Sequence, residues 1–157
     1  MKLSKGIKFL EIIILIFSIS FLINLLWEVA HSLLYNWSAL PLVNDVYAYI
    51  PRILKASIGD GFITLGIYGL GLIKNRRVNW ISNMKWGDYF LVILAGLFIS
   101  VLIERVNVHF LGRWSYNEFM PLIPGIDVGL TPILQMLILP LLIFKIINFF
   151  KLVEKLS

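Results

Sequence analysis

The chain of 157 residues contains no cysteine, which excludes a disulfide framework, a thiolate metal site and a cysteine nucleophile. Charged residues are also scarce, at 15% of the chain against a usual share of about 25% in soluble proteins. Hydrophobic residues make up 59%, and a water-soluble domain of this size has too little interior to hide that much apolar surface. The scarcity of charge therefore indicates a protein whose solvent is largely lipid.

Four long apolar runs carry most of the hydrophobic residues. They extend from about Phe9 to Tyr35, from Ile53 to Ile73, from Tyr89 to His109 and from Leu130 to Phe150. Each run suits the roughly 20 residues needed to cross a hydrocarbon layer of about 30 Å. The linkers, 37–52, 74–88 and 110–129, are too short for a soluble domain. We predict an all-α fold, a single membrane domain over residues 1–157 built as a polytopic four-transmembrane-helix bundle.

The first run has an alternative interpretation as a signal peptide, because it is apolar and follows a basic start. Its apolar core is longer than the usual 7–15 residues or so, and no small-residue cleavage pattern follows it. The run also continues into Trp27, Glu28 and His31. We therefore interpret it as a helix of the mature protein.

The basic residues predict the orientation, because cytoplasmic flanks carry an excess of Lys and Arg. Ten of the 14 lie on one side: Lys2, Lys5, Lys8, Lys74, Arg76, Arg77, Lys85, Lys145, Lys151 and Lys155. We expect both termini in the cytoplasm and a multi-pass location in the cell membrane. Because these residues sit at the ends of apolar runs, the net charge of +5 does not indicate a nucleic-acid partner. Aromatic residues mark the boundaries, with Trp27, Tyr35 and Trp37 at one interface and Trp80 and Trp86 at the other.

Polar residues gather in the halves of the runs that are predicted to lie away from the cytoplasm. Their spacing places them on one stripe of each helix: Asn24, Glu28, His31 and Tyr35; Ser57, Asp60, Thr64 and Tyr68; Ser100, Glu104 and Asn107; Thr131 and Gln135. At about 1.5 Å per residue the stripes reach a similar depth. Because a charge facing lipid costs about 2.5–3.5 kcal/mol or more, we expect these groups to face one polar pocket in the outer half of the bilayer.

The third linker is too apolar to float in water and too rich in proline and glycine to form a helix. We expect residues 110–129 to lie over the outer face or to re-enter it, across the mouth of the pocket. Arg113 offers a bidentate fork to a phosphate or carboxylate. Trp114 and Tyr116 offer rings that stack on an apolar ligand.

These groups suggest a membrane-embedded enzyme acting by acid and base catalysis on a lipidic or isoprenoid-like substrate. A carboxylic acid in a low-dielectric pocket tends to hold its proton and to act as a general acid. The candidate catalytic residues are Glu28, His31, Asp60 and Glu104, and the candidate substrate-binding residues are Asn107, Arg113, Trp114, Tyr116 and Gln135. Expected partners are the lipid bilayer and a lipidic small molecule.

No metal site is predicted and the sequence does not identify a cofactor. A metal variant would use Glu28 and His31, one turn apart, with Asp60 and Glu104. Di-iron carboxylate bundles need the Glu-x-x-His spacing on two helices, however, and this chain has one such motif.

Two other classes of function fit the same residues. A proton- or cation-coupled transporter subunit would use the acids as ion sites and the glycines of the second run, residues 59 to 71, for helix sliding; homo-oligomerisation, which the sequence leaves open, would then be needed to complete a path. A non-catalytic accessory protein would use the polar groups as structural glue, with Asp60 paired to Arg105 or Arg113, or Glu28 paired to Arg113.

Overall fold

The computed structural model describes residues 5–36 and 46–150. Side chains are described from residue 9 onward in the first range and from residue 49 onward in the second. Four long helices dominate it: α1 (Lys5–His31), α2 (Val46–Asn75), α3 (Trp86–Glu104) and α4 (Leu130–Phe149). Each contains a stretch that is long and apolar enough to cross a membrane. The four candidate spans confirm the prediction of a small, mostly helical, multi-pass membrane protein. Trp37, one of the expected interfacial aromatics, lies outside the described residues.

Short elements connect the helices. A 3₁₀ turn (Ser32–Leu34) follows α1, another (Trp80–Asn83) precedes α3, and a π-helical segment (Arg105–Phe110) continues α3. Strand β1 (Tyr35–Asn36) pairs antiparallel with β2 (Ser115–Tyr116). Strand β3 (Leu122–Ile123) pairs antiparallel with β4 (Val128–Gly129). The third linker is therefore held to the end of α1 through β2 and to the start of α4 through β4.

Helix α2 is the element whose boundary differs most from the prediction. It begins at Val46 rather than Ile53, and Pro51 lies inside it. A proline lacks the N–H that would bond one turn back, so its usual effect is to end or kink a helix. Here Pro51 stands in the second turn, where one backbone hydrogen bond is lost but the helix continues for more than six further turns.

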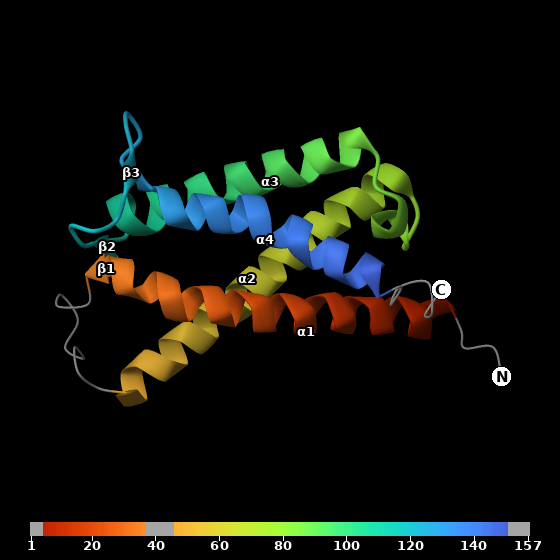
Figure 1. Ribbon diagram of the computed structural model, residues 1–157, viewed down its shortest axis with the longest axis horizontal. Coiled ribbons are helices and arrows are strands. Elements are labelled where there is room, and N and C mark those ends of the chain that lie inside the picture. The colour runs from red at the N-terminus through yellow and green to blue at the C-terminus, as the bar shows by residue number, and fades with distance from the viewer. Residues whose placement is uncertain (1–4, 37–45, 151–157) are drawn as a thin grey trace.

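The helices run alternately up and down. Figure 1 shows the end of α1, the start of α4 and strands β1 to β3 at one end of the bundle, which we call the capped end. The other end holds the start of α1, the end of α4 and the connection from α2 to α3, and we call it the basic end. Helix α2 crosses α1 obliquely, and its first turns extend away from α3 and α4 (Figure 1).

The core of the basic end is built largely from apolar side chains. The rings of Tyr68, Trp80 and Phe144 pack together with centroids 5.5–6.4 Å apart. Trp80 is fully buried, so the prediction that it anchors at the membrane interface is wrong. The connection that carries it folds back beneath the bundle, and Gly71 makes room because a Cβ there would overlap the indole ring. Trp80 Nε1 donates to the carbonyl oxygen of Tyr68 at 3.2 Å.

Each helix carries one buried stripe that changes in character along its length. On α1 the stripe runs from Ile12 and Ile16 to Ser20 and Asn24. On α3 it runs from Val92 through Gly96 to Ser100, Glu104 and Asn107. The spacing of three or four residues keeps each stripe on one face, so the apolar core of the basic end passes directly into a polar interior at the capped end.

Helices α3 and α4 cross in contact at Gly96, where a Cβ would overlap the backbone carbonyl of Met136. We predict that Gly96→Ala lowers the free energy of unfolding by about 1–3 kcal/mol, because backbone must shift to admit the methyl group. The matched control is Gly66→Ala on α2, where a Cβ meets nothing within 4 Å. Thermal unfolding in detergent tests the pair, and equal melting temperatures for the two variants would contradict the crossing.

The orientation of the bundle is open to a labelling test, because the chain has no cysteine of its own. Glu118 at the capped end and Asn83 at the basic end are both exposed. We predict that Glu118→Cys reacts with a membrane-impermeant maleimide in intact cells, whereas Asn83→Cys reacts only after permeabilisation. The reverse pattern would show that the capped end faces the cytoplasm.

Candidate functional site

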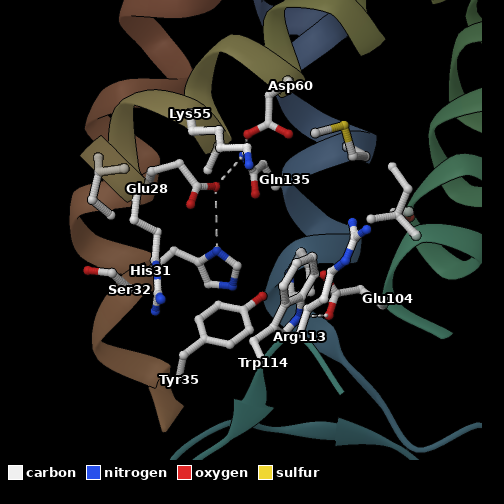
Figure 2. A pocket seen from close by; sticks show the side chains of 18 of the residues that line it. Glu28, His31, Ser32, Tyr35, Lys55, Asp60, Glu104, Arg113, Trp114 and Gln135 are labelled. Atoms are coloured by element: carbon white, nitrogen blue, oxygen red, sulfur yellow. Dashed lines mark hydrogen bonds and ion pairs between the residues drawn. The ribbon is translucent and has the colours of Figure 1, made fainter. Parts of the chain in front are cut away.

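A cavity of about 490 Å³ lies at the capped end, between all four helices and the third linker. Figure 2 shows acidic, amide, imidazole and aromatic side chains converging on it. Its polar and aromatic lining comprises Glu28, His31, Ser32, Tyr35, Asn36, Arg52, Lys55, Asp60, Ser100, Glu104, Arg113, Trp114 and Gln135. Apolar side chains, among them Ile63, Ile103 and Met136, complete the wall. All four candidate catalytic residues thus line one space.

Gln135 on α4 ties three helices together at the inner end of the cavity. Its Nε2 lies 3.0 Å from Asn24 Oδ1 and 3.0 Å from Glu28 Oε1, both on α1. The same nitrogen lies 2.8 Å from Asp60 Oδ2 on α2. Gln135 is 3% exposed, so these contacts lie in a medium where each polar group must be satisfied by protein.

The hydrogen count at Gln135 has a chemical consequence. A glutamine amide carries two N–H hydrogens, and three oxygen atoms lie within 3.0 Å of its nitrogen. Two carboxylates that approach one donor also repel each other, and a shared proton relieves that repulsion, as in other carboxyl pairs. The geometry therefore suits a Glu28 and Asp60 pair that holds one proton between them.

A chain of hydrogen bonds on the basic-end side of Gln135 supports its position. Asn24 Nδ2 donates to the Ser20 carbonyl at 2.9 Å and lies 3.1 Å from Ser20 Oγ. Ser20 Oγ lies 2.9 Å from Thr64 Oγ1 on α2, and Thr64 Oγ1 bonds the Asp60 carbonyl at 3.0 Å. Asn24 is not among the predicted catalytic or substrate-binding residues, yet it orients the amide that holds both acids. Its place on the same helical stripe as Glu28 is the signal that marks it.

Glu104 on α3 lies on another wall of the cavity. We call Glu104 with its partners Trp114 and Tyr116 the second acidic node; the first consists of Gln135, Glu28 and Asp60. It is 5% exposed, and its Oε2 accepts hydrogen bonds from Tyr116 Oη at 2.5 Å and Trp114 Nε1 at 3.2 Å. Burial, followed by the hydrogen bond to Glu104, raises the pKa of the Tyr116 hydroxyl, so Tyr116 remains a donor. These two donors fix the orientation of the Glu104 carboxyl group in the cavity.

Two of the expected substrate-binding residues support the site from outside the cavity wall. Tyr116 does not line the cavity but holds Glu104. Asn107, on the π-helical segment, accepts a hydrogen bond from Arg113 Nη1 at 3.2 Å. π-helical turns are frequent at functional sites, and this one is invisible in the sequence because no residue type marks it. It brings Asn107 into reach of Arg113, which stands on the wall of the cavity.

The ion pairs expected for the structural alternative are not formed among the described residues. Arg105 points outward and donates to the carbonyl oxygen of Ile126 at 3.1 Å. Arg113 is held by Asn107 rather than by Asp60 or Glu28. Asp60 bonds Gln135 instead. One cause is that Arg105 follows Glu104 directly, so its side chain leaves the helix about 100° away from that of Glu104.

His31 lies between the two acidic nodes and is 5% exposed. Its Nδ1 is 3.8 Å from Glu28 Oε1, which is too long for a hydrogen bond, and neither ring nitrogen has a hydrogen-bond partner among the described residues. Its ring packs edge-on against Tyr35 with centroids 4.8 Å apart. Burial and then the charge of Glu104 raise the pKa of the Tyr35 hydroxyl. Figure 2 shows the His31 imidazole directed into the cavity.

The arrangement does not form a cluster of metal ligands. Within the described parts of the chain, no three His, Asp or Glu side chains are placed to hold a metal ion together. Glu28 and His31 are near each other, but Glu104 belongs to a separate node. Comparison with known proteins adds no further assignment: no protein-family model matches the chain, and no curated protein or solved structure matches it.

A rescue experiment can test the hydrogen bonds that Gln135 Nε2 makes. We predict that Gln135→Leu lowers the free energy of unfolding by about 1–3 kcal/mol, because it removes the donor shared by three buried oxygens. Adding Glu28→Gln to this variant restores part of the loss, since an amide at position 28 supplies new N–H hydrogens. Thermal unfolding of the single and double variants in detergent measures both effects. A Gln135→Leu protein as stable as the wild type would show that these hydrogen bonds do not stabilise the fold.

Proposed function

We propose that this protein is a membrane-embedded enzyme that transfers protons to and from an apolar, lipidic substrate. The observation that carries the proposal is a buried imidazole, without hydrogen-bond partners in the described part of the chain, beside two carboxyl groups that share one donor. Such groups, in a cavity within the hydrocarbon layer, suit a reaction that needs an acid and a base but no oxidant or reductant.

The size and lining of the cavity support a small-molecule substrate. Ligand sites usually measure about 300–1,000 Å³ and combine apolar walls with a few convergent polar groups. The volume of about 490 Å³ falls within this range. Walls such as Ile63, Ile103 and Met136 would contact an isoprenoid-like chain, while Arg113 and Trp114 would hold its polar or unsaturated part.

The Glu28 and Asp60 pair would supply the general acid. A proton shared between two carboxyl groups is held in an apolar setting and is available to a substrate that cannot itself be hydrated. His31 would serve as the base, because neither of its ring nitrogens has a hydrogen-bond partner among the described residues. Glu104, oriented by Tyr116 and Trp114, would stabilise positive charge that develops on the substrate.

The simplest reaction of this kind is the shift of a carbon–carbon double bond. The acid delivers a proton to one carbon of the double bond, and a C–H bond forms there. The π electron pair forms this bond and leaves positive charge on the other carbon of the double bond. His31 then removes a proton from the carbon next to that positive carbon, and the electron pair of the broken C–H bond becomes the new double bond. The substrate is neither oxidised nor reduced; His31 releases its proton to solvent and the acid takes one up, which restores both groups.

Transport is less well supported than catalysis. An alternating-access transporter needs polar groups that reach both sides, but the polar interior stops at Ser20 and Thr64. Beyond them, Tyr68, Trp80 and Phe144 fill the basic end. A site that opens toward one side only suits an enzyme whose substrate enters and leaves the same leaflet. In this proposal the capped end faces away from the cytoplasm, as the basic flanks predict.

Solvent deuterium tests the proposed chemistry without knowledge of the substrate. The purified protein is incubated in D₂O with lipids extracted from its own host membranes, and the lipids are then analysed by mass spectrometry. We predict that a lipid species gains deuterium in the presence of the wild-type protein. Glu28→Gln and Asp60→Asn abolish the uptake, because neither amide donates a proton in the way a carboxylic acid does.

The matched control is Glu11→Gln, which removes a carboxyl group from the same helix but lies outside the cavity wall. It is expected to keep full deuterium uptake. If no lipid gains deuterium with any protein, or if all three variants behave like the wild type, the proposed proton transfer is wrong.

A further inference from the structure

The cavity reaches the outer surface of α2 at Gly59. Gly59 lines the cavity and is itself exposed. A Cβ placed at this position meets nothing within 4 Å, so there is open space above the helix beside the cavity. Lys55, one turn earlier, also lines the cavity and is exposed. Helix α2 therefore forms an edge of the cavity, and no other helix among the described residues covers it.

The depth of this opening is that of the hydrocarbon layer. Gly59 lies about 15 Å along α2 from Tyr49, the start of the candidate span, at about 1.5 Å per residue. Its neighbours on the outer face are apolar: Ile58 is 41% exposed and Phe62 is 62% exposed. Across the cavity, Ile103 on α3 is a lining residue, and Leu102 beside it is 50% exposed. An opening with such a rim faces lipid chains and not water.

The residues along this edge of α2 change from charged to apolar with increasing distance from the capped end. Lys55 stands nearest the capped end, Gly59 follows one turn deeper, and Phe62 follows almost another turn deeper. A long lysine stem can carry its ammonium toward the membrane interface, which leaves the zone at Gly59 and Phe62 apolar. The order of charge, opening and apolar surface matches the order of headgroup and chain in a lipid.

A polar group inside the cavity gives an independent sign of a ligand. The imidazole of His31 is nine-tenths buried and lacks a hydrogen-bond partner among the residues described. A buried polar group without a partner costs about 1–3 kcal/mol. A polar atom of a ligand at this place would remove that cost, while its apolar remainder would need a path out of the polar interior.

We infer that the cavity opens sideways into the bilayer at Gly59, and that its ligand is a lipid whose polar end lies near His31 and whose chain passes out over Gly59. The inference rests on the proposed function, which it deepens by defining the substrate class as chain-bearing lipids that enter from the membrane. Gly59 is then a specificity-determining residue, because any side chain there would occupy the path of the chain.

The chain itself supplies a matched control. Gly66 stands two turns further along α2, is also exposed, and also has nothing within 4 Å of an added Cβ. It does not line the cavity. Replacing either glycine by leucine improves helix propensity equally, so Gly59→Leu and Gly66→Leu differ in one respect, which is whether the new side chain stands in the opening.

The experiment uses the full-length protein in lipid nanodiscs with a long-chain fatty alcohol that carries a photoactivatable diazirine on its chain. Labelled positions are mapped by mass spectrometry. We expect label on Ile103 and Met136 inside the cavity, and on Phe98, which is 68% exposed on α3. In Gly59→Leu the label inside the cavity falls roughly tenfold, a typical effect of misfit in an apolar pocket. In Gly66→Leu the cavity label does not change, and the label on Phe98 stays the same in both variants.

A graded pair keeps the test decisive if Gly59→Leu is unstable. Gly59→Ala adds one methyl group and is expected to reduce the cavity label less than Gly59→Leu. Label that is independent of side-chain size, or absent from the cavity of the wild-type protein, overturns the inference. Deuterium uptake that persists in Gly59→Leu places the entrance elsewhere and leaves the proposed function intact. Cavity label without deuterium uptake in the wild type retains the lipid site and removes the chemistry.

Discussion

The amide of Gln135 is the contact on which the capped half of the bundle depends. In hydrocarbon, a polar side chain has no water to bond and must find its partners in the protein. Gln135 meets this need for α1 and α2 at once, through Glu28 and Asp60. It thereby sets how far these helices stand from α4 and where their carboxyl groups lie. The cavity lies on the capped side of this contact, where strands β1 and β2 join the end of α1 to the third linker.

The division of the interior into two halves follows from the same constraint. The apolar half packs mainly by shape, with Trp80 seated over Gly71, and its polar groups bond close by, as Trp80 Nε1 does to the carbonyl oxygen of Tyr68. The polar half holds its helices by hydrogen bonds, which need specific distances but leave space between them. A protein built in this way has one closed end and one end able to admit a molecule. The combination favours chemistry on a membrane-borne molecule over passage through the membrane.

Periodicity in the sequence predicted the four helices and the polar faces of α1, α2 and α3, since side-chain direction in a helix follows directly from residue spacing. It did not predict which polar groups meet. Gln135 and Asn24 are separated by 111 positions, and no local pattern indicates their contact. Charge complementarity suggested arginine as the partner of Asp60, but the geometry of α3 turns Arg105 outward. Trp80 was misplaced because an aromatic residue in a linker looks the same whether the linker floats or folds back under the bundle.

In the proposed reaction the acids have different surroundings and different tasks. Glu104 accepts two hydrogen bonds on one oxygen, from Tyr116 and Trp114, and these fix its position at the cavity, where it would support a developing cation. Glu28 and Asp60 both contact the amide of Gln135, so a proton placed between them would be shared and could be given to the substrate. His31, without a hydrogen-bond partner among the described side chains, would receive the transferred proton.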